Sequence, residues 1–78
     1  ETEDVLYNYR IMLDKMSVTL LEYYREEIDE NEFNSTPKVL ARDFFYDTAH
    51  SIGEQKASIV LGIIFPDDNF RKQLFSNE

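Results

Sequence analysis

Cysteine is absent from this chain of 78 residues, and glycine and proline are scarce, with two of each. Without cysteine the chain has neither disulfides nor thiol chemistry, and it lacks the ligand that most structural zinc sites use. His50 is the single histidine, so a histidine-based metal site or catalytic pair has no second member. The two isolated glycines form no phosphate-binding loop. We therefore expect no enzyme activity, no metal site and no cofactor.

Basic residues are also few, and the charge is unevenly distributed. The net charge is −8, from eight lysines and arginines against 16 aspartates and glutamates. Residues 1–34 carry ten acids and three bases, a net −7, whereas residues 35–78 carry six acids and five bases, a net −1. Nucleic acids and anionic membranes attract basic surfaces, so neither is the expected partner. The longest apolar run, 57–65, is far shorter than the roughly 20 residues that span a bilayer.

Apolar residues are plentiful enough to form a core, at 42% of the chain, and they include six phenylalanines and five tyrosines. Each buried aromatic side chain removes about 150–250 Å² from water. We expect one all-α domain over 1–78, a compact bundle of about four helices. A long, central helix over 3–28 would be followed by medium helices over 37–51 and 54–65 and by a short C-terminal helix. Because disulfides are absent, we expect a cytoplasmic or otherwise intracellular protein.

The first expected helix carries apolar residues on two sides. One stripe has alternating spacings of three and four residues: Leu6, Tyr9, Leu13, Met16, Leu20 and Tyr23. A second stripe on the opposite side, interrupted by Asp14, comprises Tyr7, Ile11, Val18 and Leu21. A helix that is apolar on two sides is buried on two sides, so it is either central in its own domain or in contact with a second chain. We predict that the second stripe is a protein interface, for another protein or for a second copy in a homodimer.

The boundaries of the later helices follow from proline, glycine and capping residues. Residues 29–36 are expected to form a polar linker, after which Ser35 or Thr36 caps a helix that has Pro37 in its first turn. Gly53 is expected to end that helix. The apolar run that follows is also compatible with a buried strand, but no second strand candidate is present, which favours a helix.

Three further local features are predicted in the C-terminal half. Ser51 and Glu54 have the spacing of a capping box at the start of the third helix. Gly62 in mid-helix indicates the close approach of a neighbouring helix, because glycine otherwise costs about 1 kcal/mol relative to alanine. Asp67 follows a proline and is expected to cap the last helix.

The residues around Gly53 also resemble the turn of bacterial helix-turn-helix repressors. Ala49 precedes Gly53 by four residues, and Ile52 and Ile59 stand at core positions of that pattern. The chain departs from the pattern at two positions where apolar residues are usual, Thr48 and Glu54.

This resemblance implies an alternative function, that of a DNA-binding transcriptional regulator. Its base-reading residues would be the polar ones near the N-terminus of the third helix, Gln55, Lys56 and Ser58. The remainder of that helix is nearly all apolar, and residues 37–65 carry no net charge, with three bases against three acids. The composition therefore favours an acidic, non-catalytic protein-interaction or regulatory module over the DNA-binding alternative.

Overall fold

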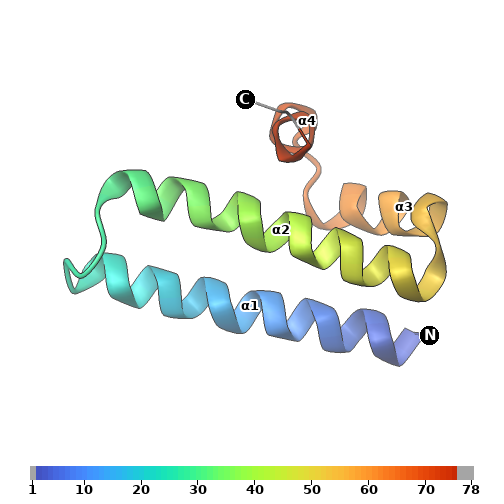
Figure 1. The fold of residues 1–78 in the computed structure, drawn as a ribbon, viewed down its shortest axis with the longest axis horizontal. Coiled ribbons are helices and arrows are strands. Elements are labelled where there is room, and N and C mark those ends of the chain that lie inside the picture. The colour runs from blue at the N-terminus through green and yellow to red at the C-terminus, as the bar shows by residue number, and fades with distance from the viewer. Residues whose placement is uncertain (1, 76–78) are drawn as a thin grey trace.

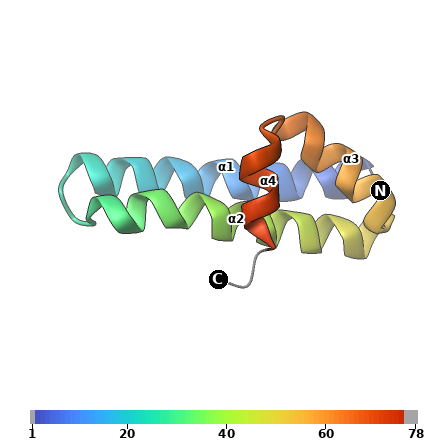
Figure 2. The same ribbon diagram turned by 90° about the horizontal axis from the view of Figure 1, so that it is seen from above.

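The computed structural model describes residues 2–75, which form four α-helices and no strand. α1 (Thr2–Tyr24) and α2 (Glu30–Ile52) form a long antiparallel hairpin. α3 (Glu54–Ile64) packs on one end of it, and α4 (Asp68–Leu74) crosses the hairpin axis (Figures 1 and 2). The predicted all-α bundle is confirmed, and the apolar run over 57–65 is helical for most of its length.

α2 is the central helix, since it packs against all three others, whereas α1 has extensive contacts with α2 alone. The prediction that the first helix is central is therefore wrong, and α2 is as long as α1. The connection from α2 to α3 explains the arrangement. A single residue, Gly53, separates the two helices and has a positive φ of 92°, which glycine adopts without a steric cost. So short a turn folds α3 back onto α2.

The core draws on every helix. Five buried apolar side chains form one contact cluster: Met12, Ala41, Phe44, Leu61 and Leu74. Ala57 is also buried but lies outside this cluster. Side chains that are partly buried pack around this cluster, including Tyr9, whose ring meets that of Phe44 edge to face with centroids 6.3 Å apart.

The side of α1 that faces the core differs from the predicted stripe. The buried residues of α1 are Met12 and Thr19. They belong to one line of residues with alternating spacings of four and three: Val5, Tyr9, Met12, Met16, Thr19 and Tyr23. Thr19 tolerates burial because its hydroxyl donates to the Lys15 carbonyl at 3.0 Å. The three leucines expected in the core are instead half exposed: Leu6, Leu13 and Leu20.

The hairpin loop is shorter than predicted. α1 ends at Tyr24 rather than at residue 28, and the chain turns through Glu26, whose φ is 62°. α2 begins at Glu30, so the predicted linker over 29–36 is mostly helix. The cap is Asp29, whose carboxylate accepts the Glu32 N–H at 2.9 Å. An aspartate at this position also stabilises the positive end of the helix dipole.

Pro37 therefore lies inside α2 rather than in its first turn. A proline there removes one backbone hydrogen bond and usually kinks a helix. Two hydroxyls supply additional hydrogen bonds in the preceding turn, since Thr36 and Ser35 donate to the Glu32 carbonyl at 2.8 and 3.3 Å. The predicted N-cap residues thus form hydrogen bonds inside the helix rather than at its start.

Of the other predicted caps, one is correct and one is wrong. Asp67 caps α4 by accepting the backbone N–H two residues on at 3.0 Å. No side chain caps α3, and Ser51 donates instead to the Asp4 carboxylate of α1 at 3.1 Å. The capping-box spacing is satisfied in sequence, but the hydroxyl forms a hydrogen bond with a different helix.

Replacing Gly62 with alanine is expected to raise the free energy of unfolding by about 0.5–1 kcal/mol. The predicted close approach of another helix at this position is wrong, because a Cβ added there meets no atom within 4 Å. The substitution thus gains helix propensity without a clash. Chemical denaturation followed by circular dichroism measures the change. Destabilisation would show that α3 packs more tightly at Gly62 than its geometry indicates.

Candidate protein-binding surface

α1 exposes an unusual number of large apolar side chains. Only Met12 and Thr19 are fully buried among its 23 residues. Eight large apolar side chains of α1 are at least 39% exposed: Leu6, Tyr7, Leu13, Val18, Leu20, Leu21, Tyr23 and Tyr24. A helix of this composition is normally covered on more than the one side that α2 covers.

The structure places three of the four predicted interface residues on the solvent side of α1. Tyr7, Val18 and Leu21 are 66%, 53% and 50% exposed. Ile11 differs from them, since it is half buried and lines a cavity between α1 and α2. Asp14 is exposed and lies at the centre of this stripe.

Sequence reasoning missed a second group of exposed residues, because it assigned Leu13 and Leu20 to the core. They are 41% and 56% exposed, and Tyr24, next to the loop, is 83% exposed. The signal that could have revealed them is the competing line of residues through Met12 and Thr19. The polar hydroxyl of Thr19 made that line look less apolar than the leucine stripe.

The exposed residues concentrate where the bundle is thinnest. We call residues 17–39 the hairpin tip; α3 lies over the other end of the α1–α2 hairpin, and α4 crosses the hairpin near its middle (Figures 1 and 2). The core cluster and the side chains packed on it extend no further than Met16 in α1 and Leu40 in α2. Within the tip, the Tyr23 and Phe33 rings stack with centroids 4.3 Å apart. Two helices alone provide too little apolar contact to cover this surface.

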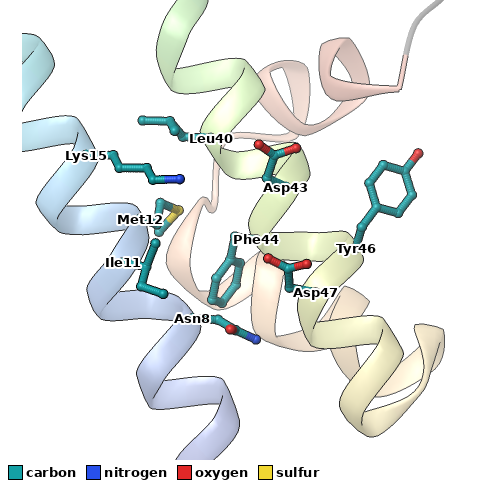
Figure 3. A pocket seen from close by; sticks show the side chains of 9 residues that line it. All are labelled: Asn8, Ile11, Met12, Lys15, Leu40, Asp43, Phe44, Tyr46 and Asp47. Carbon is teal, nitrogen blue, oxygen red and sulfur yellow. The ribbon is translucent and has the colours of Figure 1, made fainter.

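The cavity between α1 and α2 is a second candidate site (Figure 3). Its volume is about 290 Å³, just below the roughly 300–1,000 Å³ typical of small-molecule pockets. Lys15 extends into it from α1, and Asp43 and Asp47 lie one turn apart on α2 (Figure 3). All three charged residues are exposed to water, which weakens their electrostatic effect on any bound group. Within residues 2–75 no cluster of three metal-ligating side chains occurs.

The predicted DNA-reading residues lie together at the start of α3. Gln55, Lys56 and Ser58 are all exposed. The exposed side of the same helix continues with Ile59 and Ile63, at 62% and 74% exposure. Such side chains offer no hydrogen bonds to base edges, and the hydrogen bond between Ser51 and Asp4 brings a carboxylate near this corner.

Comparisons with protein-family models, curated proteins and solved structures gave no match to this chain. None of the helices described within residues 2–75 has both the length and the apolar character needed to cross a bilayer.

Proposed function

We propose that this chain is a non-catalytic protein-interaction module, with a binding or regulatory role, that contacts its partner through the exposed side of α1. The observation that carries the proposal is the number of large apolar side chains that α1 leaves exposed on its outer side and beside the groove with α2. Three of those in the tip are more than half exposed: Val18, Leu20 and Tyr24. Isolated exposed apolar residues are normal, but so many on a single helix are typical of a partner surface. Tyrosine is also enriched at interface centres.

Charge favours a different protein over a second copy as that partner. In an antiparallel α1–α1 homodimer built on Tyr7, Val18 and Leu21, the Asp14 side chains would meet at the two-fold axis. In a parallel one, both acidic hairpin tips would lie side by side. Like charges placed directly opposite each other destabilise a complex, and the chain as a whole carries −8. A partner with a basic surface would instead be attracted.

Capture of partner proteins from an extract of cells that naturally express this chain is expected to depend on α1. We expect the wild-type protein to retain a specific set of proteins, and at least one of two α1 variants to lose it. These are Val18→Gln/Leu21→Gln and Leu13→Gln/Leu20→Gln. Glutamine preserves helix propensity and net charge while removing the apolar surface.

The matched control for this experiment is Ile59→Gln/Ile63→Gln, which removes equally exposed apolar residues from α3. It should retain the same proteins as the wild type. Thermal unfolding establishes that every variant is folded. An unchanged captured set with both α1 variants would contradict the proposal, as would an equal loss with the α3 control. Sedimentation at several concentrations identifies self-association in the same samples.

A further inference from the structure

The groove between α1 and α2 is filled by α3 over only part of its length. Near the N-terminus of α1, Leu6 lines a recess together with Ile52 of α2 and Val60 of α3. Further along, Met16 of α1 and Pro37 of α2 line a second recess with residues of the α3–α4 connection. Beyond these two residues no third helix lies over the hairpin tip (Figures 1 and 2).

The floor of this uncovered part is apolar. Leu20 lies one helical turn beyond Met16 in α1, and Phe33 lies one turn from Pro37 in α2. Leu20 and Phe33 line a third recess together with Tyr23. Leu13 is seven residues from Leu20, so the two lie on the same side of α1. The apolar line that begins under α3 therefore continues along the tip.

The dimensions of the uncovered groove suit one α-helix. α3 packs on α2 and shares a recess with α1, so one helix already lies beside the hairpin in the first part of the groove. The free part extends along α1 from beyond Met16 to Tyr24. At about 1.5 Å per residue, a partner helix of about 12 residues would cover it.

The rim of the free groove is acidic. Glu26, Glu27 and Asp29 line the third recess, and Asp67 lines the second recess. Residues 20–34 carry six acids against Arg25, a net charge of −5. A second copy of the chain would bring another strongly acidic molecule to this rim, whereas lysine and arginine flanking an apolar stripe would complement it.

We infer that the uncovered groove, formed by Leu20, Tyr23 and Phe33 and flanked by Leu13 and Pro37 where it begins, binds a basic amphipathic helix of another protein, which continues the line of α3 along the hairpin. This inference rests on the proposed function and specifies its partner.

Designed peptides test the inference. The probe is a helix-forming peptide of about 14 residues with leucines at i, i+3, i+4 and i+7 and lysines elsewhere, titrated into the protein at low ionic strength. A scrambled peptide of identical composition and an acidic one with glutamate for lysine are the peptide controls. We expect the basic amphipathic peptide to bind, the scrambled one to bind about tenfold more weakly, and the acidic one not to bind.

The protein variants separate the groove from the rest of α1. Leu13→Gln/Leu20→Gln should weaken binding of the basic peptide by about tenfold. Val18→Gln/Leu21→Gln, on the outer side of the same helix, should change it by less than about twofold. Hydrogen exchange should show that the peptide protects amides of residues 17–39.

Equal binding of the ordered and scrambled peptides, an equal loss with both variants, or no binding at low salt would each overturn the inference. Concentration-dependent dimerisation abolished by Leu13→Gln/Leu20→Gln would also overturn it, by assigning the groove to a second copy. If the peptides fail while capture from extract still depends on Val18 and Leu21, the proposed function stands and only the groove assignment is wrong. If neither α1 variant changes capture, the proposed function itself is wrong, whatever the peptides do.

Discussion

Replacing Phe44 with alanine is expected to lower the free energy of unfolding by about 3–5 kcal/mol. The ring is 2% exposed, belongs to the central cluster and meets the Tyr9 ring edge to face. Alanine removes the burial of the ring and leaves a cavity between α1 and α2 that the helices can only partly close. A chain of this length has a total stability of about 4–12 kcal/mol, so the loss is a large fraction of it. Urea denaturation followed by circular dichroism measures the change.

Two further variants show whether the effect arises from the core. Tyr24→Ala also removes an aromatic ring, but at 83% exposure it should cost less than about 0.5 kcal/mol. Phe44→Leu keeps most of the apolar volume and should cost about 1.5 kcal/mol or less. Equal losses for Phe44→Ala and Tyr24→Ala would mean that the centre of the bundle lies elsewhere.

Replacing Leu74 with alanine is expected to cost about 2–5 kcal/mol and to release α4 from the bundle. Leu74 is fully buried, and its carbonyl accepts a hydrogen bond from Arg42 Nε at 2.6 Å. α4 has only seven residues and is too short to be helical without tertiary contacts. Its helical state therefore depends on tertiary contacts, and Leu74 is the residue of α4 that is buried. Denaturation gives the loss, and hydrogen exchange of the α4 amides reports the release.

The control for this prediction is Leu21→Ala, which removes the same atoms from a side chain that is half exposed on α1. It should leave exchange in α4 unchanged and cost far less stability. Slow exchange in α4 of Leu74→Ala would show that Arg42 and the neighbouring aromatic rings hold the helix without the leucine. Loss of all structure at once would instead show that α4 and the hairpin unfold as one cooperative unit.

The ends of the helices were predicted correctly where a local signal sets them and wrongly where a contact between helices does. Gly53 and Asp67 act locally, one through its backbone freedom and the other through a hydrogen bond two residues away, so their sequence signals are correct. The α2 start was placed too late because Pro37 is a strong start signal. The earlier start depends on the Asp29 cap and on the stacking of Phe33 on Tyr23, a contact between two helices.

The candidate binding surface was predicted in part. The spacing of Tyr7, Val18 and Leu21 indicated an apolar side of the first helix that is separate from its core side, and the structure exposes all three. Leu13 and Leu20 were not predicted to be exposed. The stripe that contains them and the stripe that contains Met12 and Thr19 are neighbours on one helix, and periodicity alone does not choose between two neighbouring stripes.

The sequence by itself determined that the chain is helical, how many helices it forms, and that the first helix has more apolar surface than one neighbour covers. These properties depend on residue composition, on periodicity and on caps that act within a few residues. Only the tertiary structure decided that α2 is central, that Met12 and Thr19 face it, and that α3 leaves the hairpin tip uncovered. Such features depend on which surfaces meet between helices distant in sequence, and that choice is made by side-chain packing and by the one-residue turn at Gly53 that directs α3 onto α2.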